Sequence, residues 1–351
     1  MKKILLLGSL SWWAVATLAG EPSTAARQDR LAQSPPRKVV VATACHWFSA
    51  TMDADERAAT IERLGAEAVA EASRLFPSTG LDLFVLPEHA LQRRGVTAAE
   101  RALRLDQEPV RRVVALAARH RTWLVLPMIL NEEHAGGQVF SNAAVLVDRT
   151  GKVAGIYRKT HPLAAADGSF ENGLSPGGSY PIFATDFGHV GIQICWDMAY
   201  DEGWAALAAG GAELVVLPSA SPQNVRPAAY AQRYRYWVVN STPRDNVSVF
   251  NPLGLAEAQR TTPGVLVHRF DLVSVVAHWS PRIEEGRAFR QRFGDRGGFT
   301  WSSREDAGLF WSNDARTPVG MMLRELGVES MDAQVERIGA ELARTRARPR
   351  S

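Results

Sequence analysis

The stretch that decides the fold is His189-Val190-Gly191-Ile192-Gln193-Ile194-Cys195-Trp196-Asp197, an alternating apolar run that turns aromatic and polar just after its thiol. Such alternation predicts a strand, and the change in character after Cys195 predicts that the strand ends there, at a cleft. Two other apolar runs end in the same way, residues 81–88 on the carboxylate of Glu88 and residues 155–159 on the ammonium of Lys159. A thiol, a carboxylate and an ammonium group at three strand ends indicate a reaction site.

The hydrophobic pattern of the rest of the chain predicts helices and strands in alternation. Helices are expected over residues 53–76, 98–120 and 201–209. Strands are expected over residues 38–46, 122–128, 213–218, 233–240, 248–250 and 264–270, with a hairpin formed by 142–147 and 153–157. Strands that first alternate with helices and then form hairpins predict an α/β fold with mixed sheets covered by helices.

The two ends of the chain differ from its body, residues 38–280. Lys2 and Lys3 precede the apolar residues 4–18, a pattern that predicts a signal peptide over 1–19, followed by a proline-containing linker over 20–37. The apolar stretch is shorter than the roughly 20 residues of a membrane span, which leaves an uncleaved anchor as the alternative. We therefore expect a periplasmic or secreted protein with no stable membrane span after cleavage.

A C-terminal extension is expected over residues 281–351. Residues 281–320 are rich in Arg, Gly and aromatic residues without a clear period and predict an irregular segment. Helical spacing returns with four apolar residues, which predict a last amphipathic helix that packs on the body or on another subunit. These residues are Met331, Val335, Ile338 and Leu342.

Composition excludes several classes of function. The 351 residues are 46% hydrophobic and 22% charged, ordinary values for a globular protein. The formal net charge is +3, and the arginine-rich tail accounts for much of it, so the body has no electrostatic footprint for nucleic acid. The two cysteines, Cys45 and Cys195, have no metal-ligand spacing. In an oxidising compartment they could pair, which would remove the nucleophile.

The three groups at the strand ends suit nucleophilic catalysis. A thiol with a pKa near ~8.5 is a weak nucleophile until a base or a cation favours the thiolate. Glu88 can take that proton and return it to a leaving amine, whereas Lys159 can stabilise the thiolate and then an oxyanion. The backbone N–H of Trp196 is a second candidate donor to the oxyanion. The expected intermediate is a thioester on Cys195, which a water activated by Glu88 hydrolyses.

Four motifs in order resemble those of the nitrilase, or carbon–nitrogen hydrolase, superfamily, over roughly residues 38–275. They are Pro87-Glu88, Tyr157-Arg158-Lys159-Thr160-His161, Glu171-Asn172-Gly173-Leu174-Ser175-Pro176-Gly177 and Cys195-Trp196-Asp197. The resemblance implies an αββα sandwich of two mixed β-sheets flanked by helices, a Glu88-Lys159-Cys195 triad and no cofactor. It also implies that Glu171 is a second glutamate that positions Lys159 or the substrate amide. Members of the superfamily often form dimers through helices beside the nucleophile strand, here residues 201–209.

The residues after the nucleophile bear on the substrate. Cys195-Trp196-Asp197 keeps the Trp that is usual in nitrilases but has the Asp that is usual in amidases and carbamoyl-hydrolysing members. We expect hydrolysis of a small amide or N-carbamoyl substrate with release of ammonia or an amine, and nitrile hydrolysis by the same triad is the alternative. Two other classes stay open: a Cys-His hydrolase that uses one of the histidines near the motifs, His89, His161 or His189, and a secreted binding protein without catalysis on the same fold.

Overall fold

The structure, a computed structural model, describes residues 24–347. The expected signal peptide, residues 1–19, lies outside the described residues. Within the described range, none of the helices combines the length and the apolar character needed to cross a membrane.

Two six-stranded sheets form the centre of the molecule. The first has the order β12-β1-β2-β3-β4-β5 and the second the order β11-β10-β9-β8-β7-β6. Strands of the first sheet are β1 Lys38–Cys45, β2 Leu83–Val85, β3 Trp123–His134, β4 Gly137–Val147, β5 Val153–Arg158 and β12 Gly264–Asp271. Strands of the second are β6 Ile182–Ala184, β7 His189–Ile192, β8 Leu214–Pro218, β9 Trp237–Ser241, β10 Val247–Phe250 and β11 Ala256–Arg260. In each sheet three central strands are parallel and the outer ones antiparallel, so both sheets are mixed.

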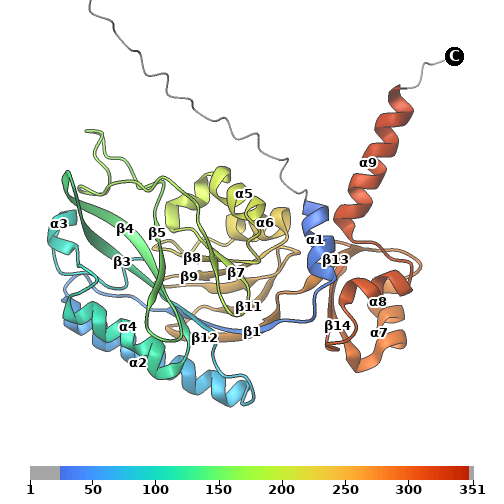
Figure 1. The fold of residues 1–351 in the computed structure, drawn as a ribbon, viewed down its shortest axis with the longest axis horizontal. Coiled ribbons are helices and arrows are strands. Elements are labelled where there is room, and N and C mark those ends of the chain that lie inside the picture. Colours follow the sequence, from blue (N-terminus) through green and yellow to red (C-terminus); the bar gives the residue numbers. More distant parts are fainter. Residues whose placement is uncertain (1–23, 348–351) are drawn as a thin grey trace, which may run out of the picture.

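Helices cover the outer faces of both sheets (Figure 1). The first sheet is covered by α2 Ala54–Leu75 and α4 Glu108–His120, and the second by α5 Asp201–Ala209 and α6 Val225–Tyr234. One apolar core lies between the sheets, and one lies between each sheet and its helices. The expected αββα sandwich is therefore confirmed.

Local sequence explains where α2 begins and which face it buries. Asp53 accepts a hydrogen bond from the N–H of Glu56 at 2.9 Å, and the Glu56 carboxylate accepts one from the N–H of Asp53 at 2.8 Å, which forms a capping box. Ile61, Leu64 and Ala68 are buried at helical spacing against the first sheet. This packing fixes the sheet whose strand ends carry Glu88 and Lys159.

Two expected elements have different bounds. The helix expected over 98–120 is two helices, α3 Ala98–Arg101 and α4, because the chain between them is extended and Leu103 bridges to Leu130 of β3. The strand expected over 233–240 begins only at Trp237, since α6 continues to Tyr234 and Arg235 ends it with a left-handed φ of 54°.

The segment expected as a linker, residues 20–37, contains helix α1 Thr24–Ala32. Its prolines at 35 and 36 follow the helix and do not interrupt it. Ala25, Gln28 and Ala32 are buried on one face of α1. The helix packs against β13 Ser274–His278, α8 Val319–Glu325 and α9 Met331–Ala347. The helix is thus joined to the C-terminal part of the chain.

The extension expected to be irregular over 281–320 is an ordered unit. It consists of α7 Arg287–Phe293, β14 Gly297–Ser302, β15 Ala307–Ser312 and α8 Val319–Glu325, with β13 Ser274–His278 completing a sheet of order β13-β15-β14. Phe289, Phe293 and Phe310 pack together in a separate core. The aromatic residues that gave no period in the sequence fill this core.

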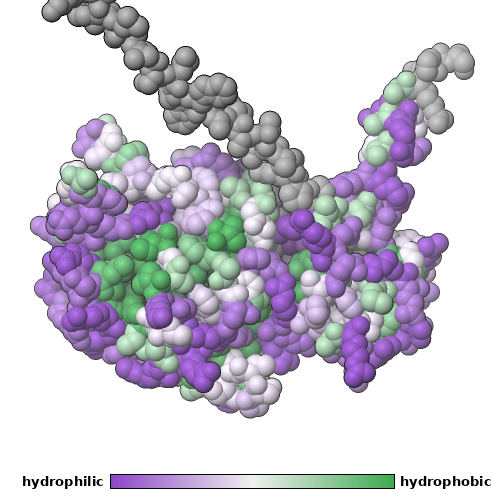
Figure 2. Space-filling model, viewed as in Figure 1, coloured by the Kyte–Doolittle hydropathy of each residue, from purple (hydrophilic) through white to green (hydrophobic). Residues whose placement is uncertain are grey.

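The last helix, α9 Met331–Ala347, is confirmed as a helix. Val335, Ile338 and Leu342 are 60%, 44% and 48% exposed, so the expected packing of this stripe on the body is wrong, and its packing on another subunit stays a prediction. Figure 2 shows the later part of α9 projecting from the rest of the molecule, with apolar and charged residues side by side along it, whereas the start of the helix packs against α1 and β13.

Candidate active site

One cavity of about 390 Å³ brings together the four side chains selected from the sequence. Glu88 follows β2, Lys159 follows β5, and Cys195 begins the short 3-10 helix η1, Cys195–Ala199, just after β7. Glu171 reaches the cavity from the loop after β5. Strand ends of both sheets therefore supply the chemical groups, as the sequence predicted.

Lys159 lies between two carboxylates. Its Nζ donates to Glu88 Oε1 at 3.0 Å and to Glu171 Oε1 at 2.6 Å, and only 2% of the residue is exposed. Burial by itself lowers the pKa of this ammonium group, but the charges of Glu88, Cys195 and Glu171 outweigh burial and raise the pKa above its ordinary value. Lys159 is therefore held as a cation beside the thiol.

Glu88 is an ionised carboxylate with a full set of partners. Beside Lys159, Oε1 accepts from Asn142 Nδ2 at 2.8 Å, and Oε2 accepts from the backbone N–H of Ala220 at 2.9 Å. Burial raises the pKa of this group, but the charge of Lys159 and the hydrogen bonds from Lys159 and Asn142 outweigh burial, and the resulting pKa is about 2. Glu88 can thus accept a proton but does not hold one at rest.

Cys195 projects from a strained turn. Its φ is 43°, a left-handed conformation that residues other than glycine seldom adopt and that often marks functional sites. Burial, and then the charge of Glu88, raise the pKa of the thiol to about 12, although Lys159 opposes them. The resting nucleophile is a neutral thiol beside a carboxylate base. Both cysteines are free, so the disulfide left open by the sequence is not formed.

Trp196 follows Cys195 within η1, but its side chain does not line the cavity. The role of its backbone N–H as an oxyanion donor stays a prediction.

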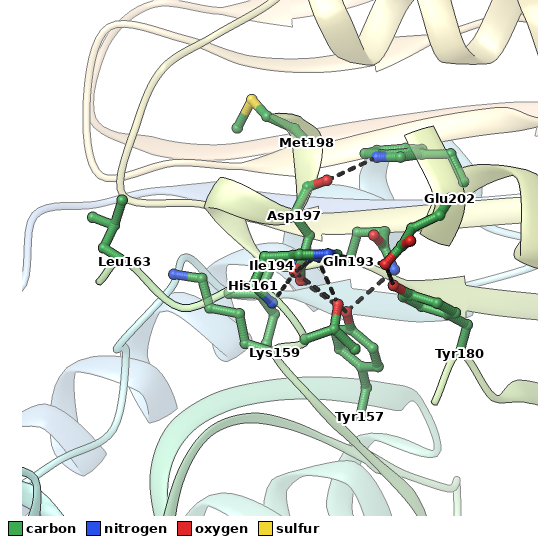
Figure 3. A network of polar contacts seen from close by, with 12 residues as sticks. Tyr157, Lys159, His161, Leu163, Tyr180, Gln193, Ile194, Asp197, Met198 and Glu202 are labelled. Atoms are coloured by element: carbon green, nitrogen blue, oxygen red, sulfur yellow. Dashed lines mark hydrogen bonds and ion pairs between the residues drawn. The ribbon is translucent and has the colours of Figure 1, made fainter. Parts of the chain in front are cut away.

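Asp197 connects the nucleophile turn to the strand end that carries Lys159 (Figure 3). The side chain is fully buried, and Oδ2 accepts from the Tyr157 hydroxyl at 2.8 Å and from the N–H of Ile194 at 2.9 Å. Oδ1 accepts from the Thr160 hydroxyl at 3.0 Å and from the N–H of His161 at 2.9 Å. Sequence reasoning treated Asp197 only as a marker of substrate class and missed this role.

His161 belongs to the same network and does not line the cavity. Its Nδ1 lies 3.1 Å from Asp197, its Nε2 lies 3.0 Å from Glu202, and its ring stacks on Tyr200 at 3.9 Å. The hydrogen bond to Asp197 raises the pKa of the imidazole. Figure 3 shows Lys159 pointing away from this group. The placement of His161 disfavours a Cys-His hydrolase that uses this residue.

Sequence reasoning missed Asn142 and Arg101, and it named His89 only as one of three candidate histidines of a Cys-His hydrolase. Both Arg101 and His89 line the cavity. Asn142 is a buried amide in β4 that contacts both Glu88 and, at 3.4 Å, Glu171. Its signal was present, because an Asn at the start of the apolar run 143–147 needs a polar partner when buried. His89, with a φ of 60°, directly follows Glu88.

Glu88, His89 and Glu171 offer three ligand atoms within 4.8 Å of one another, the spacing of a metal site. The ammonium group of Lys159 bonds to both carboxylates. A metal ion at this point would have to displace a buried cation, so these residues fit the lysine and not a metal.

A family model described as carbon-nitrogen hydrolase matches residues 38–276. The chain belongs to this family. The resemblance inferred from the four motifs is therefore confirmed.

Among relatives, a β-ureidopropionase of Arabidopsis thaliana is 31% identical over 159 residues, which is 42% of this chain and 38% of the relative. A citrullinase of Francisella tularensis is 30% identical over 117 residues, 33% of this chain and 40% of the relative. The chain thus spans less than half the length of these two relatives.

Solved structures of other carbon–nitrogen hydrolases share the fold. Saccharomyces cerevisiae Nit3, a member of branch 10 of the nitrilase superfamily, matches 74% of this chain and 95% of its own with a TM-score of 0.55 and 21% identity. A carbon-nitrogen hydrolase of Helicobacter pylori G27 matches 67% of this chain and 90% of its own, with a TM-score of 0.56 and 19% identity.

Proposed function

We propose that this carbon–nitrogen hydrolase cleaves the C–N bond of small amides or N-carbamoyl compounds through a thioester on Cys195 and releases ammonia or an amine. The observation that carries the proposal is the position of Lys159, held between Glu88 and Glu171 in the cavity that contains the thiol. This set supplies a nucleophile, a base and a cation within one site and needs no added group.

The raised pKa of the thiol and the lowered pKa of Glu88 define the first step. A free thiolate is not the resting form, so Glu88 takes the thiol proton as the sulfur attacks the substrate carbon. The carbonyl oxygen gains negative charge, which the Lys159 ammonium stabilises. Glu171 fixes that ammonium from its other side.

The next steps return the enzyme to its starting state. Glu88 gives its proton to the leaving nitrogen, the C–N bond breaks, and the acyl group remains on sulfur as a thioester. Water then attacks the thioester while Glu88 takes a proton from it, and the C–S bond breaks with that proton returned to the thiol. Each turnover consumes one water and yields an acid and ammonia or an amine.

Two considerations favour amide and carbamoyl substrates over nitriles. The relatives described above bear the names of a ureidopropionase and a citrullinase, and N-carbamoylputrescine amidases are also similar to this chain. In addition, the residue after Trp196 is Asp, as is usual in amidases. Nitrile hydrolysis by the same residues is an outcome that the experiment distinguishes.

The proposal is tested by ammonia release from a panel of small amides, ureido acids and nitriles, with intact-mass detection of the thioester. The wild-type protein is expected to release ammonia from amides or ureido compounds, and Cys195→Ala to release none. Cys45→Ala is the matched control, because Cys45 is a free cysteine in β1 outside the cavity, and it should keep the activity. Turnover by Cys195→Ala would refute the proposal, and turnover of nitriles alone would assign the alternative.

We also propose export with cleavage of residues 1–19, and a homodimer formed through α5. N-terminal sequencing of the protein from its native cells tests the first. Light scattering combined with size-exclusion chromatography tests the second, and a monomer at micromolar concentration would contradict it.

A further inference from the structure

The catalytic cavity contains a second cation whose donors are largely free. Arg101, the last residue of α3, lines the cavity together with Cys195 and Lys159. Its side chain makes one hydrogen bond within residues 24–347, from Nη2 to the carbonyl oxygen of Glu171 at 3.3 Å. Nε is buried without a hydrogen-bond partner, and Nη1 has none in the same range. A guanidinium group has five N–H donors, so most of them are unused.

The backbone of Arg101 is held firmly, which fixes the point on the cavity wall from which its side chain extends. Thr97 and Glu100 form a capping box at the start of α3. The N–H of Ala98 donates to the carbonyl oxygen of Asn172 at 2.9 Å, and the carbonyl oxygen of Arg101 accepts from the N–H of Arg93 at 2.8 Å. A donor group held before the ligand arrives loses little conformational entropy on binding.

Charge within the cavity sets Arg101 apart from Lys159. Both carboxylates of the site, Glu88 and Glu171, hydrogen-bond to Lys159, and neither forms an ion pair with Arg101. Burial lowers the pKa of the His89 imidazole, and the charge of Lys159 lowers it too, so that the opposing charge of Glu88 is outweighed. His89 is therefore not a cation that competes with Arg101 for an anion. Arginine keeps its charge in such surroundings. Leu163, Ala164 and Ala165 on the same wall offer only apolar side chains.

We propose that Arg101 binds a carboxylate of the substrate, and that the natural substrates are therefore acids bearing a terminal amide or ureido group. This inference rests on the proposed amide or carbamoyl hydrolysis and deepens it by assigning the charge of the substrate. Guanidinium and carboxylate groups match in a two-point hydrogen-bonded geometry, in which Nη2 donates together with either Nη1 or Nε. Nη2 has two N–H groups and uses one of them for Glu171, so its second N–H and its unpaired neighbours can serve a carboxylate. A cavity of about 390 Å³ accommodates a short acid of this kind.

The test compares acids with neutral molecules of similar size: succinamate with butyramide, and 3-ureidopropionate with propylurea. Arg101→Met should lower the ratio of kcat/KM for the acid to that for its neutral counterpart by about 10- to 100-fold, mainly through KM, because charge-assisted hydrogen bonds are lost. Arg101→Lys should give an intermediate ratio, since it keeps the charge and loses the fork. Arg104→Met is the matched control, because Arg104 is exposed, pairs with Asp106 outside the cavity, and should leave the ratio unchanged.

A binding measurement separates this inference from the proposed reaction. Calorimetry with succinamate is carried out on Cys195→Ala and on Cys195→Ala/Arg101→Met, where the second substitution should weaken binding by about 10- to 100-fold. Such weakening without turnover by the wild-type protein would reject the reaction but support the carboxylate site. An unchanged ratio in Arg101→Met, an equal fall for acids and neutral molecules, or equal binding by both variants would overturn the inference.

Discussion

Replacing Asp197 with Asn tests whether one buried carboxylate joins the nucleophile turn to the lysine strand. Asn has nearly the same shape, so the change removes a charge and one acceptor atom without opening a cavity. If the amide oxygen takes the position of Oδ1, it keeps the bonds from Thr160 and from the N–H of His161. The amide nitrogen then faces the Tyr157 hydroxyl and the N–H of Ile194.

The two groups that face the amide nitrogen respond differently, and this difference determines how much stability the substitution removes. The Tyr157 hydroxyl can rotate and accept a hydrogen bond, but the N–H of Ile194 can only donate and is left buried without a partner. An unsatisfied buried donor costs about 1–3 kcal/mol, and loss of the charge weakens the remaining bonds. We expect Asp197→Asn to lower the free energy of unfolding by about 3–5 kcal/mol, the range found when a buried ion pair, here that of Asp197 with His161, loses one partner.

Urea denaturation monitored by tryptophan fluorescence measures this loss, and kcat/KM measured where the variant is still folded should fall with it. Asp201→Asn is the matched control, because Asp201 accepts from the Tyr234 hydroxyl at 2.8 Å but is 46% exposed. It should cost less than about 1 kcal/mol. If both variants were equally stable, the assignment of Asp197 as the link between the two segments would be wrong.

Three other perturbations have defined outcomes. Gly177→Ala should lower the free energy of unfolding, measured by chemical denaturation, by about 1–3 kcal/mol, because a Cβ there would meet the backbone carbonyl of Arg158. Gly178→Ala is the control: its Cβ would meet nothing within 4 Å, and it should change the free energy of unfolding by less than about 0.5 kcal/mol. Burial raises the pKa of Asp271 to about 6, above the unfolded value of ~3.9, so its contribution to stability is full below the unfolded pKa and is lost as pH rises through about 6. The stability of Asp271→Asn relative to wild type should therefore rise by up to about 3 kcal/mol between pH ~4 and ~6 and then level off, and a difference that is constant over this range would contradict the assignment. Because the pKa of the Cys195 thiol is raised to about 12, its alkylation by iodoacetamide should accelerate by about tenfold per pH unit up to pH ~10, and a plateau below pH ~9 would show an ordinary thiol.

Residues at strand ends were predictable from the sequence because a charged or nucleophilic group that stops an apolar run is visible in one short window. Glu88, Lys159 and Cys195 were found in this way. Glu171 lies in a loop, where a carboxylate is unremarkable by itself, and only the family resemblance selected it. Arg101 lies 70 residues from the carbonyl group that it contacts, so no local pattern reveals the contact.

The C-terminal unit was missed for a different reason. The run Phe299-Thr300-Trp301-Ser302 alternates as a strand should, but the glycines and arginines around it obscured the pattern. The pKa of Cys195 shows a limit of another kind: the sequence placed a cation beside the thiol and favoured a thiolate, whereas burial outweighs that cation in the folded protein. Burial depends on packing across the whole sandwich, which a short motif does not specify.

The packing of α1 against the C-terminal unit has a practical consequence for shortened forms of the protein. A protein trimmed to residues 38–276 would end inside β13 and would lose β15, the strand that pairs with it. Val275, which is buried in the full chain, would then lie at an unpaired strand edge of the kind that promotes aggregation. Trimming residues 24–37 alone would remove Ala32 from the same core. A shortened protein should therefore stay soluble only if it keeps the contact between α1 and the C-terminal unit, which lies outside the bounds of the family match.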